Sequence, residues 1–188
     1  MPTHRHFIIH KPYGYISQFV NPAKRKKKLL GELYAFPEKT MAIGRLDVPS
    51  EGLLFLTTDG KVSDYIRSKK IEKEYVVQVD GLLTHTAVDL LKKGVEIGFN
   101  GTKYITKPCV ASLIPDPNFE KRVQKIRDER HGPTSWVSIT VTEGKFRQIR
   151  KMTAAVGFPT LRLVRVRIGE ILLDGLVVGA VKEVAKLY

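Results

Sequence analysis

An arginine and an aspartate, Arg45 and Asp47, stand two residues apart in the stretch AIGRLDVPSEGLLFLTTDG, which covers residues 42–60. A carboxylate beside a guanidinium stays ionised, and it can then act as a nucleophile or as a base. An ion pair that only fixes a turn has the same pattern, because structural Arg–Asp pairs outnumber catalytic ones. From these two residues alone, both interpretations stay open.

Two apolar segments flank this pair and must position it. Residues 42–43 precede it, and the run LLFL over residues 53–56 follows after a turn that contains Pro49 and Gly52. A short apolar run bounded by turn residues is typical of a strand buried on both faces, and it is far too short to span a membrane. We therefore expect Asp47 on a loop between two core strands, which is a usual place for a reactive side chain.

The chain carries a large positive charge. Its 188 residues include 32 Lys and Arg against 19 Asp and Glu, which gives a net charge of +13 and an isoelectric point near 9.8. Such a charge favours polyanions, of which nucleic acid is the commonest, although a basic surface that only improves solubility is the alternative. The length predicts a single domain over residues 1–188.

The cysteine and apolar content indicates the compartment. Cys109 is the only cysteine. A single cysteine cannot form an intrachain disulfide, and it makes a cysteine-based metal site implausible. Both facts fit a protein of the reducing cytoplasm. The N-terminus lacks the apolar core of a signal peptide, and no apolar stretch approaches 18 residues, so we expect neither export nor a membrane span.

Apolar periodicity predicts an irregular mixture of strands and helices. Thr84 is a good N-cap for a helix that Gly94 ends, with an apolar stripe of Ala87, Leu90 and Leu91. We expect strands near residues 7–9, 75–80, 103–114 with an interruption at Pro108, 136–142, 160–168, and 171–184 with breaks at Gly175 and Gly179, and further helices over residues 62–68 and 146–156. Alternation places Tyr75, Val77 and Val79 on one face of their strand, and Val137, Ile139 and Val141 on the buried face of theirs. This order argues for an α+β fold around a mostly antiparallel sheet.

Two basic segments have little apolar patterning. Residues 24–28, KRKKK, are expected to be exposed, either as an arm that contacts phosphates or as a solvated helix start. Residues 115–133 predict a long exposed loop that carries many cations. Loops of this length within a domain are usually functional or disordered, and the basic content favours a face toward RNA.

Three motifs together resemble those of the pseudouridine synthases, specifically the branch that modifies ribosomal RNA. The segment GRLD over residues 44–47, followed by SEGLL and LTTDG, is similar to the first motif, in which Asp47 is the catalytic residue. KEYVVQVDG over residues 73–81 is similar to the second motif, a Lys-x-Tyr at the head of a strand. Its tyrosine, Tyr75, would stack on the target base or assist proton transfer, and a core aromatic is the alternative.

The later motifs add an arginine and a leucine. EGKFRQIRKM over residues 143–152 is similar to the third motif, in which Arg150 matches the position that pairs with the catalytic aspartate. Leu163 matches an apolar residue near the base and the tyrosine. A solvated helix face is the alternative for Arg150, and ordinary core packing is compatible with the role of Leu163. The substrate-binding residues expected from the motifs are Arg45, Lys73, Arg147 and Leu163.

The resemblance covers nearly the whole chain and implies a function. Within the RsuA/RluB/RluE/RluF branch, the sequence is most similar to the RluE-type enzymes of large-subunit (23S) ribosomal RNA. The resemblance implies the pseudouridine synthase catalytic fold, a mostly antiparallel mixed sheet flanked by helices with a basic cleft. We expect the small N-terminal RNA-binding domain common in this branch to be absent. The expected reaction is isomerisation of one specific uridine to pseudouridine.

The expected partners follow from this reaction, which needs no cofactor and no metal. His4, His6 and His10 alternate, but no carboxylate or cysteine joins them as a ligand. We expect ribosomal RNA as the partner, either free or in a pre-ribosomal particle, with no membrane contact and a monomeric protein. A transfer RNA pseudouridine synthase and a non-catalytic RNA-binding assembly factor are the alternatives.

Overall fold

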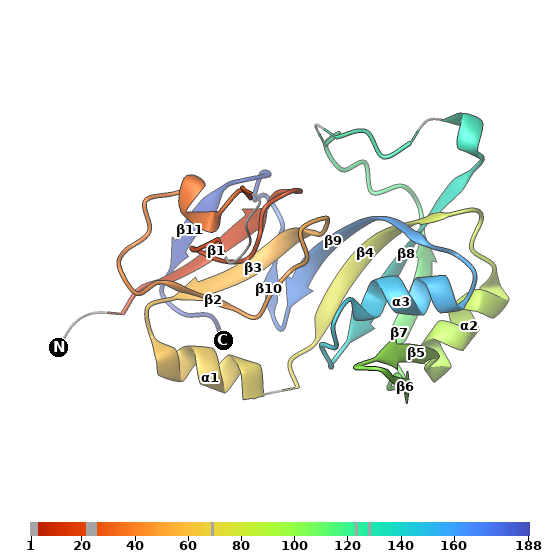
Figure 1. Cartoon of the computed structure of the whole chain (residues 1–188), viewed down its shortest axis with the longest axis horizontal. Helices are drawn as coiled ribbons and strands as arrows, with labels where there is room; N and C mark the ends of the chain where they lie inside the picture. Colours follow the sequence, from red (N-terminus) through yellow and green to blue (C-terminus); the bar gives the residue numbers. More distant parts are fainter. Residues whose placement is uncertain (1–3, 22–25, 69, 123, 128) are drawn as a thin grey trace. The chain divides into compact units, whose positions relative to one another are not determined.

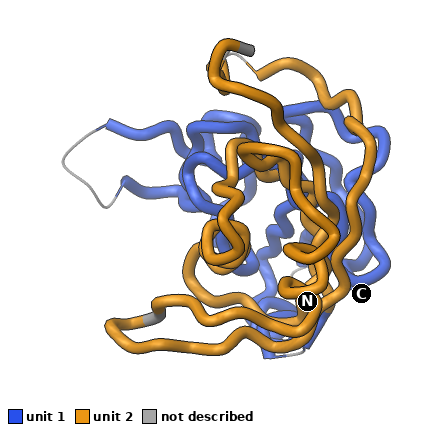
Figure 2. Tube along the Cα trace, turned by 90° about the vertical axis from the view of Figure 1, so that its right-hand side faces the viewer, with its two compact units in different colours: residues 1–71, 164–188 blue, residues 72–163 orange. Residues whose placement is uncertain are grey.

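A computed structural model describes residues 4–21, 26–68, 70–122, 124–127 and 129–188. The chain divides into two compact units (Figure 2). Unit 1 combines residues 1–71 with residues 164–188, and unit 2 comprises residues 72–163. Strand β9 (Thr160–Ile168) carries the chain from unit 2 back into unit 1. The expectation of a single catalytic domain stays a prediction.

Unit 1 is built on a sheet with the strand order β11-β1-β3-β9 (Figure 1). Strands β3 and β9 pair in parallel, and the other pairs are antiparallel. Helix α1 packs on β2 and β3. The elements of this unit, beside β9, are β1 (His6–Lys11), the 3-10 turn η1 (Leu30–Glu32), β2 (Met41–Ile43), β3 (Glu51–Thr57), α1 (Gly60–Ser68), β10 (Ile171–Leu172) and β11 (Val181–Val184).

Strand β3 is the core strand that the apolar run predicts. All seven of its residues are buried, which confirms burial on both faces. Its neighbours in the sheet contribute the buried side chains of Phe7, Ile9 and Val164. Because β2 ends at Ile43 and β3 begins at Glu51, Asp47 lies on the connecting loop as expected.

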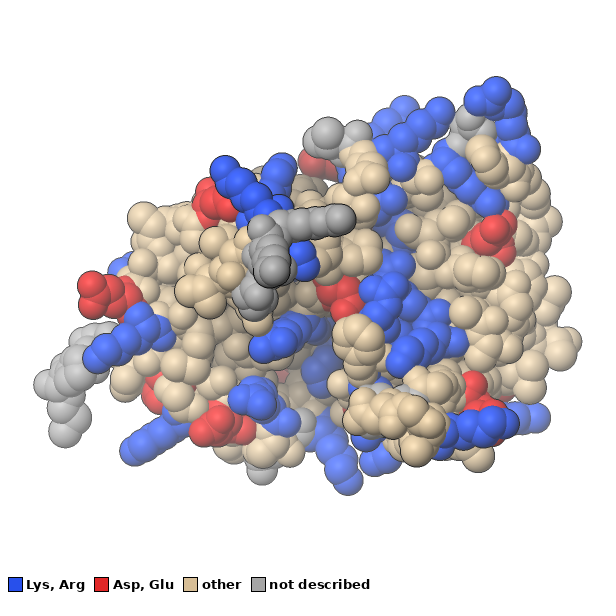
Figure 3. Space-filling model, viewed as in Figure 1, with Lys and Arg blue, Asp and Glu red and all other residues tan. Residues whose placement is uncertain are grey.

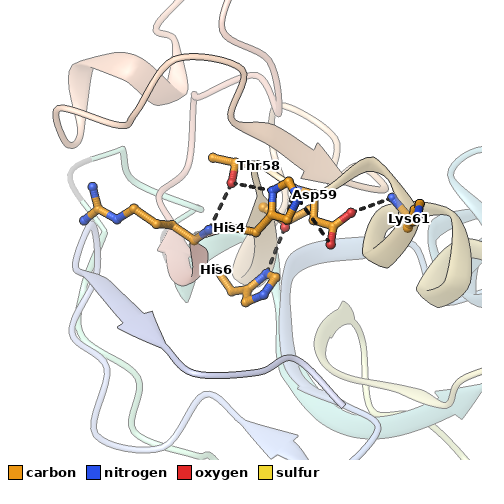
Figure 4. A network of polar contacts seen from close by, with 7 residues as sticks. His4, His6, Thr58, Asp59 and Lys61 are labelled. Atoms are coloured by element: carbon orange, nitrogen blue, oxygen red, sulfur yellow. Dashed lines mark hydrogen bonds and ion pairs between the residues drawn. The ribbon is translucent and has the colours of Figure 1, made fainter. Parts of the chain in front are cut away.

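The N-terminal histidines take part in contacts that tie β1 to the end of β3 (Figure 4). His6 Nδ1 lies 2.9 Å from Thr57 Oγ1, and His4 Nε2 lies 3.9 Å from a carboxylate oxygen of Asp59. The other Asp59 oxygen accepts a hydrogen bond from the backbone N–H of Lys61 at the start of α1. Within the described part of the chain, no three His, Cys, Asp or Glu side chains gather as metal ligands.

Unit 2 is built on an antiparallel sheet with the order β4-β8-β7, and β5 and β6 form a separate hairpin. Helix α2 packs on β7, and α3 packs on β5. The elements are β4 (Lys73–Asp80), α2 (His85–Lys93), β5 (Glu96–Phe99), β6 (Thr102–Ile105), β7 (Val110–Ile114), the 3-10 turn η2 (Glu129–His131), β8 (Thr134–Val141) and α3 (Gln148–Ala155). The predicted α+β class is confirmed. No helix among the described residues is long and apolar enough to cross a bilayer.

The predicted buried faces of the two long strands of unit 2 are confirmed, but the alternation is incomplete, because Val76, Trp136 and Thr140 on the opposite faces are buried too. Tyr75, Val77 and Val79 of β4 are buried, and so are the predicted residues Val137, Ile139 and Val141 of β8. The register places Tyr75 opposite Ile139 and Val77 opposite Val137. These side chains form the centre of the unit 2 core.

Helix α2 confirms its predicted caps but not the whole of its predicted apolar face. Thr84 Oγ1 accepts a hydrogen bond from Ala87 N at 3.2 Å, and Gly94 ends the helix at φ +96°. Leu90, however, is 47% exposed, and Val88 is buried in its place. Helix α2 packs against strand β7, and this strand decides which face of the helix is covered. The contact is not local in sequence.

Two further boundaries differ from the prediction. The helix expected over residues 146–156 begins only at Gln148, because Arg147 has a left-handed backbone with φ +53°. Phe146, which lies before the helix, is 65% exposed. The strand expected over residues 103–114 is interrupted at Pro108 as predicted, but its two parts, β6 and β7, belong to different sheets.

Candidate active site

The loop that carries Asp47 is fixed by contacts with the segment after β1. Leu46 N donates a hydrogen bond to Ser17 Oγ at 2.9 Å, and Ser17 Oγ donates to Leu46 O at 2.9 Å. Gly14 N donates to Val48 O, also at 2.9 Å. The backbone groups of both neighbours of Asp47, Leu46 and Val48, therefore make hydrogen bonds to another segment. A reactive side chain needs rigid support of this kind.

Asp47 itself is half-buried, while Arg45 on the same loop is exposed. The Asp47 carbonyl oxygen accepts a hydrogen bond from the buried residue Ser50 at 3.0 Å and closes the turn before β3. The backbone of this loop is thus fixed before, at and after the aspartate. An ionised carboxylate held in this way is suited to act as a base or a nucleophile.

Lys11, at the end of β1, interacts with the turn after β1 and, electrostatically, with Asp47. It ends β1 with a fully buried side chain, and its Nζ donates to the carbonyl oxygens of Pro12 at 2.9 Å and Tyr15 at 2.8 Å. Burial lowers the pKa of Lys11 to about 7, while the negative charges of Glu51 and Asp47 act to raise it. Lys11 therefore stabilises the turn after β1 and lies within electrostatic reach of Asp47.

The start of β3 makes an unusually close approach to β9. Glu51 pairs with Val164, and Gly52 pairs with Arg165. A Cβ on Gly52 would lie 2.6 Å from Arg165 N and closer still to its carbonyl oxygen, and the Gly52 backbone has φ +108°. Only glycine fits this position without strain. Arg165 is buried, and its Nε donates to Leu53 O at 2.8 Å, which fixes the same crossing.

Sequence reasoning did not assign Ser17, Gly14 or Lys11 a role at the site. Ser17 has no local pattern that distinguishes it from other loop serines. Lys11 gave one usable signal, because a lysine at the end of an apolar strand must either turn to solvent or find buried acceptors. The contacts that Ser17 and Gly14 make join segments about thirty residues apart along the chain.

Unit 2 carries the predicted tyrosine and leucine on strands. Tyr75 lies on β4 and is largely buried, and Lys73 begins that strand in a half-buried position. Leu163 is buried on β9. These positions agree with a tyrosine at the head of a strand. The roles of the three residues stay predictions.

The predicted arginines lie at the start of α3. Arg150 is half-buried on the helix, and Arg147 is exposed just before it. Glu143 fixes this helix start, since it accepts hydrogen bonds from Tyr104 Oη at 2.6 Å and Gln148 Nε2 at 2.6 Å. It also accepts one from the backbone N–H of Lys107 at 2.9 Å.

These contacts decide the ionisation of Glu143. Burial alone would raise its pKa, but the hydrogen bonds from Tyr104, Lys107 and Gln148 more than offset this effect, and the pKa lies below its ordinary value. The bond to Glu143 raises the pKa of Tyr104 in turn. The carboxylate therefore stays charged and holds the segment that leads into α3.

The seven predicted site residues divide between the units. Arg45 and Asp47 belong to unit 1 and share one loop. Lys73, Tyr75, Arg147, Arg150 and Leu163 belong to unit 2. Of the predicted basic run, Lys24 and Arg25 lie outside the described residues, and residues 26–28 are exposed. The described residues of the predicted loop over residues 115–133 are irregular apart from η2.

Comparison with known proteins identifies the family. The family described as RNA pseudouridylate synthase matches residues 5–155. Ribosomal large subunit pseudouridine synthase E of Xanthomonas axonopodis pv. citri (strain 306) is 40% identical over 171 residues, which cover 90% of this chain and 88% of that protein. The protein of the same name from Vibrio vulnificus (strain CMCP6) is 39% identical over 180 residues, covering 95% of this chain and 74% of that protein.

A more distant relative and a solved structure agree. Ribosomal small subunit pseudouridine synthase A of Escherichia coli (strain K12) is 33% identical over 173 residues, which cover 90% of this chain and 65% of that protein. A structure described as a crystal structure of pseudouridylate synthase has a TM-score of 0.77 at 26% identity, covering 98% of this chain and 72% of that chain. The fold and the family predicted from the motifs are confirmed. The chain belongs to the RNA pseudouridylate synthase family, whose members are isomerases.

Proposed function

We propose that this chain isomerises one uridine of large-subunit (23S) ribosomal RNA to pseudouridine, with Asp47 as the catalytic carboxylate. The observation that carries the catalytic assignment is the loop of Asp47, whose backbone is held at Leu46 by Ser17 and at Val48 by Gly14. Four relatives named ribosomal large subunit pseudouridine synthase E are 39–40% identical to this chain. The relative named ribosomal small subunit pseudouridine synthase A is 33% identical. Ribosomal large subunit pseudouridine synthase B of Bacillus subtilis (strain 168) is 30% identical, so the support for the large-subunit target comes from the higher identity to synthase E in particular.

The reaction defines what the residues must do. The bond between uracil N1 and ribose C1′ breaks, the base turns, and a bond forms between C5 and C1′. The proton on C5 is lost and N1 gains one, so no oxidant and no added water is consumed. A uridine stacked within RNA must first be extruded, which costs a few kcal/mol.

Asp47 acts on the extruded nucleotide by one of two first steps, attack on ribose C1′ or removal of a ribose proton. Both need an ionised carboxylate in a fixed position. Following the family pattern, we assign to Arg150 the positive charge that keeps Asp47 ionised. Tyr75 then stacks on the base or assists proton transfer, and Leu163 packs near the base and the tyrosine.

The remaining predicted residues bind the substrate. Arg45 and Arg147 are exposed cations, as phosphate contacts require. Arg45 also guards the space that the base vacates, and half-buried Lys73 stands two residues before Tyr75. The partner is ribosomal RNA, free or in a pre-ribosomal particle, and we place the protein with this RNA in the cytoplasm as a monomer. Basic residues 24–28 and the loop over residues 115–133 add affinity for the RNA backbone.

The test uses transcripts of large-subunit RNA, small-subunit RNA and transfer RNA. Each is incubated with the chain, and pseudouridine is mapped by carbodiimide adducts that stop reverse transcriptase. A new stop in large-subunit RNA alone, absent with Asp47→Asn, is the expected result. A stop confined to another RNA overturns the target, and full conversion by Asp47→Asn overturns the catalytic assignment. Binding without any conversion would support a non-catalytic RNA-binding factor.

A further inference from the structure

The loop over residues 115–133 and the neighbouring strands of unit 2 line a hollow of about 1270 Å³. Its floor includes Gln78 of β4, Trp136 of β8 and Arg162 of β9. None of the seven predicted site residues is among the described residues that line it. The hollow exceeds the roughly 300–1,000 Å³ of small-molecule sites, so it suits a larger ligand than a metabolite.

Positive charge dominates the lining. The cations are Lys121, Arg122, Lys125, Arg127, Arg130 and Arg162, and Asp116 is the carboxylate in the described lining. Arg127 donates to Asp80 at 2.6 Å, which balances one of these charges. The upper right of Figure 3, where Figure 1 places this loop, shows many Lys and Arg side chains. A hollow with this excess of charge concentrates polyanions.

Two aromatic side chains, Phe119 and Trp136, contact one another among these cations. The Phe119 ring is 5.8 Å from the Trp136 ring in an edge-to-face arrangement, and the Arg162 guanidinium lies 5.4 Å from the centre of the Phe119 ring. Arg162 is buried and donates to Glu120 O at 3.0 Å, so the loop is attached to β9 at this point. Trp136 is buried, whereas Phe119 is only half-buried.

This combination indicates the kind of ligand. An aromatic ring fixed within a cationic groove is how proteins hold unpaired nucleotides, because the base stacks while the phosphates meet the cations. A nucleic acid duplex keeps its bases stacked on one another and offers none to the ring. An acidic peptide would use the charge but would leave the aromatic group unexplained.

We propose that this hollow binds an unpaired segment of the RNA substrate that does not include the isomerised uridine. One base stacks against Phe119, and the adjoining phosphates contact the lysines and arginines of the loop. The proposal takes the RNA substrate from the proposed function. It adds a second site of RNA recognition, built by unit 2 alone, that selects single-stranded RNA beside the target.

The first test replaces the aromatic ring and measures the RNA affinity directly. Phe119→Leu keeps an apolar side chain but removes the stacking face. We expect its Kd for a single-stranded RNA of about 12 nucleotides to rise at least about 5-fold, and its Kd for a blunt RNA duplex of that length to stay unchanged. Tyr65→Leu, an exposed aromatic of unit 1, is the matched control and should change neither Kd.

The second test reverses charge in the hollow. Lys121→Glu/Lys125→Glu changes two residues of the lining, and Lys93→Glu/Lys186→Glu makes the same change in net charge outside it. The plot of log K against log salt has a negative slope. For the single strand, the first variant should make this slope shallower by about 0.7 for each phosphate that the loop no longer binds. The control should keep the slope. Thermal unfolding of every variant separates loss of folding from loss of binding.

The outcomes distinguish this proposal from the proposed function. Unchanged single-strand affinity in folded Phe119→Leu, or an equal loss in the Lys93→Glu/Lys186→Glu control, overturns the hollow as an RNA site. Both tests measure binding without turnover. Failure of the unmodified chain to convert any RNA would therefore contradict the proposed function and leave the binding tests to decide on the hollow.

Discussion

One side-chain atom of Ser17 holds both backbone groups of Leu46. Ser17 Oγ accepts from Leu46 N and donates to Leu46 O, each at 2.9 Å, and both residues are buried. Leu46 immediately precedes the proposed catalytic residue, Asp47. A contact between segments 29 residues apart therefore holds the backbone directly before this residue.

Ser17→Ala is expected to reduce catalysis more than RNA binding. It removes both hydrogen bonds and leaves two buried backbone groups of Leu46 unsatisfied, which costs about 1–3 kcal/mol of stability. A shift of about 1 Å at a catalytic group can cost roughly 100-fold in rate. We expect kcat for uridine conversion to fall about 10- to 100-fold, with Kd for RNA nearly unchanged. Ser68→Ala, which alters an exposed contact of α1, should retain full kcat, and an unaltered kcat in Ser17→Ala would argue against this role.

Asp47→Asn is expected to abolish conversion while it preserves folding. The amide has the shape of the carboxylate but is neither a nucleophile nor a base at neutral pH. We expect kcat to fall at least about 1,000-fold, with the unfolding temperature and the Kd for RNA close to those of the unmodified chain. Single-turnover conversion of the target RNA measures this. Asp64→Asn, on the exposed face of α1, is the control and should convert RNA normally.

Gly52→Ala is expected to destabilise unit 1. The added Cβ would meet the Arg165 backbone at a positive φ, so β3 and β9 would have to separate at this point. We expect a loss of about 2–4 kcal/mol in the free energy of unfolding, measured with urea. Gly60→Ala has open space around its Cβ and should cost little. Equal stability of the two variants would contradict the close approach.

Lys11 is expected to make stability increase with pH. Burial lowers its folded pKa to about 7, against an ordinary value of 10.5, so between these pH values the unfolded chain retains a proton that the folded chain has released. The free energy of unfolding then rises with pH in this window, by at most about 1.4 kcal/mol per pH unit.

Lys11→Met removes this titration. The difference in unfolding free energy between the unmodified chain and Lys11→Met should change from about pH 7 toward pH 10, in favour of the unmodified chain, and stay constant below this window. The measurement is urea unfolding at a series of pH values. Lys182→Met alters an exposed lysine and should give a curve parallel to that of the unmodified chain. If Lys11→Met is also parallel, the lysine does not titrate in the folded state as expected.

Glu143→Gln is expected to loosen the start of α3. The amide oxygen replaces only part of a carboxylate that accepts from Tyr104, Lys107 and Gln148. We expect a loss of about 1–2 kcal/mol at neutral pH, since hydrogen bonds to charged groups are stronger than neutral ones.

The pH dependence distinguishes this effect from a simple change of shape. The pKa of Glu143 is lowered in the folded state, so its contribution is present above the ordinary value of 4.5 and is lost as pH falls through the folded pKa. The difference between Glu143→Gln and the unmodified chain should shrink in acid. Glu170→Gln, in an exposed turn, should show no such difference at any pH. A constant difference for Glu143→Gln would indicate a packing effect instead.

Local patterns predicted much of this fold. The apolar run after Gly52 predicted a buried strand, and alternation predicted one buried face of β4 and one of β8. Thr84 and Gly94 marked the ends of α2, because capping depends on residues within one turn. The motifs identified the family for the same reason, since each is a short continuous segment. These features are decided by neighbours along the chain.

Other features of the molecule depend on residues that meet only after folding. The exposure of Leu90 depends on the strand that α2 packs against. The cationic hollow depends on long-range attachments of the loop over residues 115–133, through Arg162 of β9 to Glu120 and through Arg127 to Asp80 of β4.

The sequence by itself determined most of the elements and the family, and it named the predicted site residues. Tertiary structure decided how the Asp47 loop is held, because Ser17 acts on the backbone groups of Leu46 and no local pattern encodes this contact. A hydrogen-bond partner 29 residues away leaves no periodic trace in the chain. Its effect becomes visible only when both segments share one buried environment.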